Sequence, residues 1–342
     1  MSQAPPRAVI LGCAGPEVSE QEKRFFAEVD PLGFILFARN CRTPGQVRTL
    51  AADLRASVER DDAPVLIDQE GGRVARLGPP HWRTPPAARK FGERYDRDAA
   101  MAVEAARLNS RLIAADLAGL GIDVDCLPVL DVPRPGADPI IGDRAYHTDP
   151  NIIAALGRAA AEGLLAGGVL PVIKHIPGHG RANVDSHEAL PLVDTPLGEL
   201  DETDFEPFRA LADMPWAMTA HVVYSEIDGD APATLSRRIL TEIVRYRIGF
   251  EGLLVSDDLS MKALRGSLTG RAAGALAAGC DVALHCNGDM AEMEAVASGS
   301  APLTDAALAR LDRGREMADS PDSPDFAALG AKLAALMPEA AG

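Results

Sequence analysis

The sequence predicts an α/β protein that folds as a single-domain (β/α)8 barrel, the TIM-barrel architecture. Eight short apolar segments occur along the 342 residues, and most are followed by a longer segment with helical character. Most of the apolar segments are continuous rather than alternating, which is typical of parallel strands buried on both faces. Eight strands with intervening helices is the number that closes such a barrel.

The expected strands run from the start of the chain to its last quarter. They are Ala8–Cys13, Gly33–Phe37, Val65–Asp68, Ile122–Leu127, Leu170–Lys174, Ala217–Ala220, Leu253–Ser256 and Val282–Leu284. The expected helices between them are amphipathic or rich in alanine, and several are followed by glycine, as helix ends often are. They are Pro44–Arg60, Ala99–Ala118, Asn151–Ala166, Pro207–Ala212, Ser236–Tyr246 and Thr269–Ala278.

A doubly wound open sheet is the alternative fold for an alternating pattern. Such a sheet usually has a glycine-rich dinucleotide turn after its first strand. Here Gly12-Cys13-Ala14-Gly15 is only a fragment of that turn, and no acidic residue supports it. The pattern therefore favours the barrel.

We expect one domain over residues 1–342, because no internal repeat, low-complexity tract or long linker interrupts the pattern. The last segment, residues 320–342, begins with Ser-Pro-Asp-Ser-Pro and continues as an alanine- and leucine-rich helix. We expect this segment to be a peripheral C-terminal extension that packs on the outside of the barrel.

Composition limits the classes of partner. The chain has 34 basic and 50 acidic residues, a net charge of −16, and no cluster of Lys or Arg. Nucleic acid and anionic membranes are therefore not expected as partners. Five scattered cysteines match no metal-binding spacing and predict reduced thiols. With no secretory signal and no run of 18 apolar residues, the sequence predicts a cytoplasmic protein.

Polar side chains recur where the predicted strands end. Catalytic groups of a barrel come from the carboxyl ends of its strands. The relevant segments are Asp68–Arg73, Asp123–Asp131, Lys174–Gly180, His221, Ser256–Asp258 and His285–Asn287. Their recurrence predicts an active site at that end.

Lys174 and His175 come directly after an apolar strand. Neighbouring side chains of a strand face opposite sides of the pleat, so we expect one of the two to enter the barrel mouth. A strand-end lysine paired with a neighbouring carboxylate is the structural alternative.

The following loop contains Asp185-Ser186-His187. An aspartate two residues before a histidine can accept the imidazole Nδ1–H, which fixes the tautomer and raises the basicity of Nε2. On a loop, such a pair can act as an acid/base. Read alone, it can equally be a surface histidine beside a turn aspartate.

Asp257 and Asp258 end the seventh strand. A carboxylate at the end of a buried strand is costly unless it is solvated, paired or used. One of them can therefore be a nucleophile for glycosyl transfer, with the His187 imidazole in place of the usual second carboxylate. The alternative is a pair of N-cap residues before a helix at Leu259–Leu264.

Taken in order, the motifs resemble glycoside hydrolase family 3, in particular its short single-domain bacterial β-N-acetylglucosaminidases of peptidoglycan recycling. The resemblance covers nearly the whole chain. It rests on Ile67–Val74, Pro128–Val132, Ile141–Arg144, Lys174–Gly180, Asp185–His187 and Ser256–Met261.

The resemblance implies a retaining exo-enzyme that removes β-linked N-acetylglucosamine from the non-reducing end of muropeptide-type glycans (GlcNAc-1,6-anhydroMurNAc and its peptides). It assigns Asp257 as the nucleophile and His187 as the acid/base, with Asp185 orienting His187. The residues that match sugar-binding positions are Asp68, Arg76, Arg144, Lys174 and His175. It implies no cofactor and no metal, and we expect a monomer or weak homodimer.

Three other functions stay open at this point. The histidines and aspartates at the strand ends are the side chains of a metal-dependent hydrolase, although no spacing forms a familiar ligand set and Lys174 beside His175 would repel a cation. A family 3 glycosidase or phosphorylase of other specificity is the second. A sugar-binding protein without catalysis is the third, but binding alone needs neither nucleophile nor acid/base.

Overall fold

The computed structural model describes residues 4–318 and 321–338. The predicted domain of residues 1–342 and its extension of 320–342 therefore include residues 1–3, 319, 320 and 339–342, which lie outside the described part.

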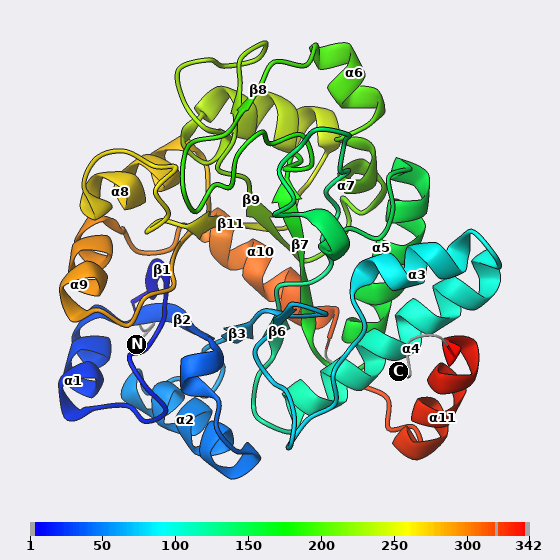
Figure 1. Ribbon diagram of the computed structural model, residues 1–342. Coiled ribbons are helices and arrows are strands. Elements are labelled where there is room, and N and C mark those ends of the chain that lie inside the picture. Colours follow the sequence, from blue (N-terminus) through cyan, green and yellow to red (C-terminus); the bar gives the residue numbers. More distant parts are fainter. Residues whose placement is uncertain (1–3, 319–320, 339–342) are drawn as a thin grey trace.

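Eight parallel strands close into a barrel, as predicted (Figure 1). Around the barrel the order is β1, β12, β11, β9, β7, β6, β3 and β2. Their bounds are β1 Arg7–Leu11, β2 Pro31–Leu36, β3 Val65–Ile67, β6 Val124–Asp125, β7 Leu170–Ile176, β9 Trp216–Thr219, β11 Leu253–Asp258 and β12 Val282–His285. Each overlaps a predicted strand, although β6 keeps only two of the six residues expected.

Helices surround the barrel (Figure 1). Those that overlap predicted helices are α2 Pro44–Ser57, α4 Ala99–Ala118, α5 Pro150–Leu165, α7 Glu206–Ala210, the π-helical η4 Ile239–Ile248, α8 Leu268–Ala278 and α11 Phe326–Leu336. The others are α1 Glu20–Val29, α3 Ala88–Tyr95, α6 Leu197–Glu202, α9 Met290–Gly299 and α10 Asp305–Glu316. Short 3-10 turns occur at η1 Ala38–Asn40, η2 Gly142–Arg144 and η3 Ala233–Leu235. Within the described residues, no helix has both the length and the hydropathy to cross a membrane.

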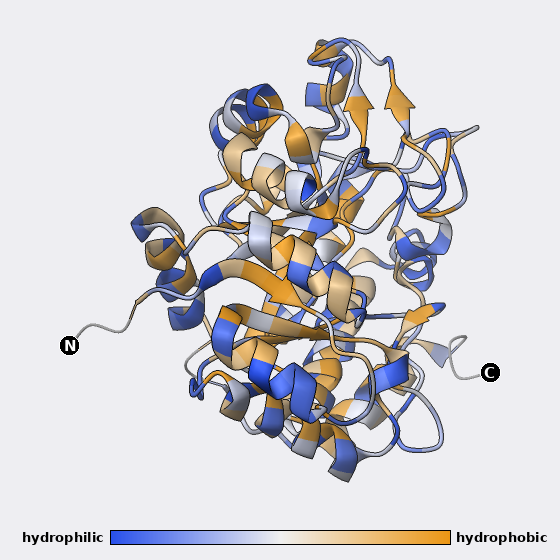
Figure 2. Ribbon diagram, turned by 90° about the vertical axis from the view of Figure 1, so that its left-hand side faces the viewer, coloured by the Kyte–Doolittle hydropathy of each residue, from blue (hydrophilic) through white to orange (hydrophobic). Residues whose placement is uncertain are grey.

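Two apolar layers hold the barrel together, and the strands at its centre are the most apolar part of the molecule (Figure 2). The inner layer fills the barrel with side chains such as Ile10, Leu66 and Val255. Leu303 and Leu311 belong to the same cluster, so α10 and the residues just before it close the amino-terminal end. The outer layer packs the strands against the helices. The packed interior leaves the carboxyl ends of the strands as the place for a site.

Two small sheets follow the carboxyl ends of barrel strands. The hairpin of β4 (Gln69–Gly71) and β5 (Val74–Ala75) comes directly after β3. Its turn contains Gly71 and Gly72, both with positive φ, a conformation that favours glycine. The parallel pair β8 (Leu192–Val193) and β10 (Val223–Tyr224) follows β7 and β9. Both small sheets therefore lie in the loops that follow the carboxyl ends of the barrel strands.

The last helix, α11, lies beside α4 (Figure 1). The Arg111 guanidinium lies 4.9 Å from the ring centroid of Phe326, and Lys332 pairs with Glu104 at 2.7 Å. Ahead of α11, the buried Arg111 Nε donates to the Asp322 carboxylate at 2.5 Å. These contacts attach the end of the described chain to the outside of the barrel.

The barrel has little space for extra atoms at Gly33 in β2. A Cβ built there would lie 2.4 Å from the carbonyl oxygen of Pro64 and 2.8 Å from its Cγ. We expect Gly33→Ala to lower the free energy of unfolding by about 1–3 kcal/mol, the usual cost of overpacking. Urea denaturation followed by circular dichroism measures it.

Gly45→Ala in α2 is the matched control, because no atom lies within 4 Å of its added Cβ. It should be neutral or slightly stabilising, since alanine is the better helix former. Equal effects of the two substitutions would contradict the close approach of β2 to Pro64.

Candidate active site

A cavity of about 260 Å³ opens among the carboxyl ends of the barrel strands. Of the eight predicted site residues, seven line it: Asp68, Arg76, Arg144, Lys174, His175, His187 and Asp257. Asp185 does not line it and stands behind His187. The structure therefore brings the whole predicted set to one place.

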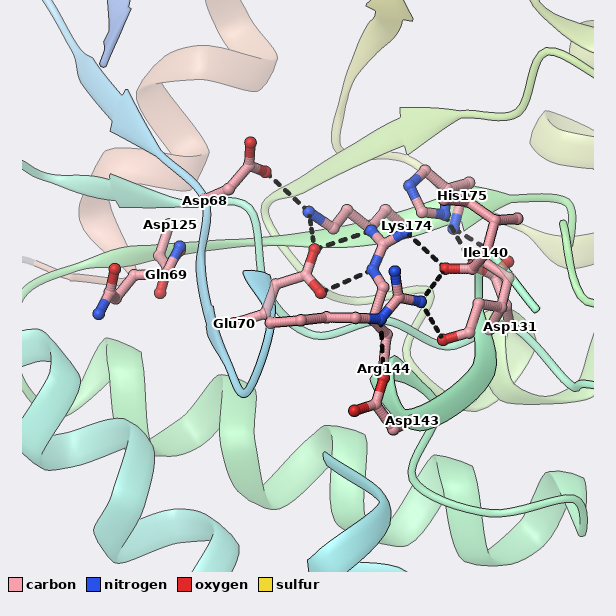
Figure 3. Close-up of polar contacts among 12 residues, drawn as sticks. Asp68, Gln69, Glu70, Asp125, Asp131, Ile140, Asp143, Arg144, Lys174 and His175 are labelled. Carbon is pink, nitrogen blue, oxygen red and sulfur yellow. Dashed lines mark hydrogen bonds and ion pairs between the residues drawn. The ribbon is translucent and has the colours of Figure 1, made fainter. Parts of the chain in front are cut away.

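Lys174 is the centre of an ion network in this cavity (Figure 3). Its ammonium group is 2.9 Å from Asp68 Oδ1 and 2.6 Å from Glu70 Oε1. The Lys174 side chain is only 2 % exposed. A buried ammonium group is tolerated only when it is paired and hydrogen-bonded, and here two carboxylates do this.

Two arginines complete the network. Arg76 Nη2 is 2.9 Å from Asp68 Oδ2. Arg144 binds both oxygens of Glu70 at 2.8 and 2.9 Å (Figure 3). The network thus holds three cations and two carboxylates in the order Arg76–Asp68–Lys174–Glu70–Arg144. Burial raises the pKa of Asp68 and of Glu70, but their cationic partners outweigh it and hold both pKa values below the usual range.

The β4–β5 hairpin positions Arg76. The Gln69 side-chain oxygen accepts the backbone N–H groups of Arg76 and Leu77, at 2.9 and 3.0 Å. Arg73, at the turn, pairs with Asp143 at 2.9 Å and donates to the Pro139 and Ile140 carbonyls. The hairpin is thereby joined to the loop that carries Arg144.

Asp125, at the end of β6, differs from Asp68 and Glu70 in the direction of its pKa shift. Its Oδ1 accepts the Gln69 backbone N–H at 2.9 Å. Burial raises the pKa of Asp125 to about 8. The group is therefore mainly protonated at neutral pH and adds no third negative charge around Lys174.

His175 and His179 share one carboxylate, that of Asp131. His175 Nδ1 lies 2.7 Å from Asp131 Oδ2, and the His179 backbone N–H donates to Oδ1 at 2.6 Å. Burial raises the pKa of Asp131, but His175 and His179 outweigh it and lower the pKa below its usual value. An ionised Asp131 next to His175 Nδ1 leaves His175 Nε2 available to the cavity.

Both Lys174 and His175 line the cavity. Alternation along a strand accounts for only one of the two in the barrel mouth, whereas the family resemblance assigns both to sugar binding. The alternation of a regular strand does not apply here, because the register of β7 with β9 shifts between Lys174 and Ile176.

Asp257 is the last residue but one of β11 and is buried, with 7 % of its surface exposed. Its Oδ1 accepts the backbone N–H of Asp258 at 2.8 Å. Burial raises the pKa of Asp257, but His221, His175 and the Asp258 N–H together hold it below its usual value. Asp257 is therefore an ionised carboxylate on a rigid strand end.

The neighbouring Asp258 holds the turn that follows β11. Its carboxylate accepts the backbone N–H and the hydroxyl of Ser260, at 3.0 and 2.6 Å. His221 Nε2 lies 3.0 Å from the Asp258 carbonyl oxygen, so the imidazole donates there. No helix follows within 259–264, and the helix N-cap reading of this pair is therefore wrong.

Asp185 and His187 form the predicted pair. Asp185 Oδ1 lies 2.8 Å from His187 Nδ1 and accepts the His187 backbone N–H at 2.8 Å. Burial alone would raise the pKa of Asp185, but the two contacts from His187 lower it. The His187 side chain is 58 % exposed. The pair can thus supply a proton donor with a fixed tautomer beside the cavity.

Sequence reasoning assigned no role to Glu70, Asp131 or Ser186. Glu70 pairs with two predicted sugar-binding cations, and Asp131 orients a third group, His175. The available signal was chemical. A lysine and a histidine expected together at a buried strand end need acidic partners, and Glu70 and Asp131 stand in neighbouring strand-end motifs.

The described residues contain no group of three or more His, Cys, Asp or Glu side chains that could hold a metal ion. Of the acidic groups in the cavity, Asp68 and Glu70 are instead paired with Lys174, Arg76 and Arg144.

Comparison with known proteins agrees with this geometry. A model of the glycosyl hydrolase family 3 N-terminal domain matches residues 11–313. A β-hexosaminidase of Chromobacterium violaceum is 39% identical over 340 residues, 96% of this chain and 94% of its own length. One from Bordetella avium is 39% identical over 290 residues, 84% of this chain and 82% of its own.

Solved structures agree as well. Native NagZ from Neisseria gonorrhoeae has a TM-score of 0.87 and 33% identity, covering 98% of this chain and 99% of its own. Its complex with N-trifluoroacetyl-D-glucosamine has the same TM-score at 34% identity, covering 98% and 100%. Both the predicted barrel and the predicted glycoside hydrolase are confirmed. The chain belongs to glycosyl hydrolase family 3, as its ordered motifs indicate.

Proposed function

We propose that this protein is a retaining exo-β-N-acetylglucosaminidase in which Asp257 is the nucleophile and His187 the acid/base, oriented by Asp185. The observation that carries the proposal is a buried, ionised carboxylate and an Asp–His pair at one cavity. The names of the β-hexosaminidase relatives support the sugar class, as does the N-trifluoroacetyl-D-glucosamine bound by the Neisseria gonorrhoeae protein.

In the first step the Asp257 carboxylate attacks the anomeric carbon and forms a glycosyl ester. The bond from that carbon to the leaving oxygen breaks, and protonated His187 gives its Nε2 proton to that oxygen. Asp257 suits this role because it is ionised and fixed by the Asp258 N–H.

In the second step neutral His187 takes a proton from water while the water oxygen attacks the same carbon. The ester bond breaks, Asp257 returns to a carboxylate, and the configuration is retained overall. Asp185 stabilises the imidazolium at Nδ1 in both steps.

The ion network would hold the sugar. Carboxylates such as Asp68 accept sugar hydroxyls, while Lys174, Arg76 and Arg144 donate to hydroxyl oxygens and to the N-acetyl carbonyl. His175 offers Nε2 on the same wall. A cavity of about 260 Å³ suits one sugar ring rather than a length of chain, which supports cleavage from an end.

The finer assignment is also a proposal. We infer that the substrate is a muropeptide-type glycan, GlcNAc-1,6-anhydroMurNAc with or without its peptide, and that the role is cell-wall recycling in the cytoplasm. We expect the protein to act as a monomer or weak homodimer.

Asp257→Ala should reduce kcat on an aryl β-N-acetylglucosaminide by at least about 10³-fold, because the covalent step loses its nucleophile. Circular dichroism should show an intact fold. Asp312→Ala on the exposed side of α10 is the matched control and should keep wild-type activity. Near-normal turnover by the Asp257 variant would exclude the nucleophile role.

His187→Ala should discriminate between leaving groups. An alkyl glycoside needs a proton on its leaving oxygen, so its hydrolysis should fall by about 10²–10⁴-fold, whereas a dinitrophenyl glycoside should be affected far less in the first step. Steady-state kcat/KM for the two substrates measures this. Equal losses on both would argue against acid catalysis by His187.

The lowered pKa of Asp257 predicts a flat acidic limb with an activated substrate. A carboxyl with a folded pKa below its usual value of 3.8 stays ionised as the pH falls from about 7 to about 5. We expect kcat/KM for the dinitrophenyl glycoside to stay within about twofold over that range. A decline with a midpoint at about pH 6 would mean that the Asp257 pKa is raised instead.

A further inference from the structure

Ser186 stands between the two members of the Asp185–His187 pair and is buried, unlike them. Only 4 % of Ser186 is exposed, against 58 % of the His187 side chain. Its hydroxyl oxygen is 3.2 Å from His179 Nε2 and donates to Met261 Sδ at 3.9 Å. These contacts attach the loop that carries His187 to the body of the protein at Ser186.

The contacts of Ser186 reach the segments that follow two barrel strands, β7 and β11. His179 follows β7, and its backbone N–H is held by Asp131 at 2.6 Å. On the other side, the Ser186 carbonyl accepts the Ala263 N–H at 3.2 Å. Met261 and Ala263 belong to the turn after β11, the strand that carries Asp257. Ser186 therefore lies between the wall that carries His175 and the strand end that carries the proposed nucleophile.

The hydrogen bonds within the Asp185–His187 pair do not fix the position of the loop relative to the barrel. Both of its hydrogen bonds stay between the two residues. Within the described part of the chain, the hydrogen bonds that connect residues 185–187 to the segments after β7 and β11 all involve Ser186. The position of His187 relative to Asp257 thus depends on its neighbour.

His179 is suited to a fixed, neutral role. Burial, together with His175, lowers the pKa of His179 to about 4. A neutral ring can form a hydrogen bond with a hydroxyl in either tautomer. Its Nδ1 is buried without a partner among the described residues, so Ser186 is the hydrogen-bond partner that these residues offer the ring.

We propose that Ser186 is a positioning residue for the acid/base, and that its contacts with His179 and the β11 turn hold His187 over the cavity. The inference rests on the proposed function, in which His187 gives and takes the proton. Ser186 touches no reacting atom and acts through the position of its neighbour.

The test compares Ser186→Ala with Ser300→Ala. Ser300 is equally buried at 4 %, and its hydroxyl donates to the Val296 carbonyl at 2.9 Å at the end of α9, away from the cavity. We expect Ser186→Ala to lose about tenfold in kcat on an alkyl β-N-acetylglucosaminide, about the worth of one hydrogen bond, and less than about twofold on the dinitrophenyl glycoside. Ser300→Ala should keep wild-type values on both.

The second readout does not depend on catalysis. Hydrogen–deuterium exchange followed by mass spectrometry should be faster in residues 183–189 of Ser186→Ala and unchanged in Ser300→Ala. His179→Leu should have the same effect on exchange, and the double variant should add little to it, because both substitutions remove one contact.

The proposal requires both results. An unchanged leaving-group dependence in Ser186→Ala, or unchanged exchange in residues 183–189, would overturn it. Failure of the proposed function looks different, because His187→Ala itself would then show no leaving-group dependence. In that case exchange still decides whether Ser186 fixes the loop.

Discussion

The ammonium group of Lys174, buried between Asp68 and Glu70, is the interaction on which the site depends. A charge so far from water is expensive, and either carboxylate without its partner would leave an uncompensated ion. Arg76 and Arg144 extend the arrangement, so the ends of β3 and β7, the β4–β5 hairpin and the loop around residue 144 must meet in one geometry. The network fixes the walls of the cavity before any substrate arrives.

The two proposed catalytic groups are held in different ways, one by a barrel strand and the other by a loop. Asp257 is part of a barrel strand, and its carboxylate is fixed by the next backbone N–H. His187 is on an exposed loop and keeps only its tautomer from Asp185. A nucleophile must hold one position through both steps, whereas an acid/base exchanges its proton with a leaving group and then with water. The division between a strand and a loop fits these needs, and Ser186 connects them.

The barrel and the place of the cavity could be predicted from the sequence, because the apolar strands and the polar residues at their ends are both clear patterns. Buried parallel strands are continuously apolar, which located all eight, and unusual polar residues at their ends located the cavity. Other features depend on contacts between distant segments. The α1 helix (Glu20–Val29) and α10 are rich in charged residues and were not predicted, and the entry of both Lys174 and His175 follows from a shift in strand register. The roles of Glu70, Asp131 and Ser186 appear only once their partners are in place.

The central claim is that the Asp257 carboxylate forms a covalent bond with the sugar. The most direct test is to trap the glycosyl-enzyme with a slow fluorinated N-acetylglucosamine substrate and to map the labelled peptide by mass spectrometry. The account predicts label on Asp257 in the segment that ends β11. Label on Asp258 or on Asp68, or a substrate turned over with inversion and no trapped ester, would contradict it.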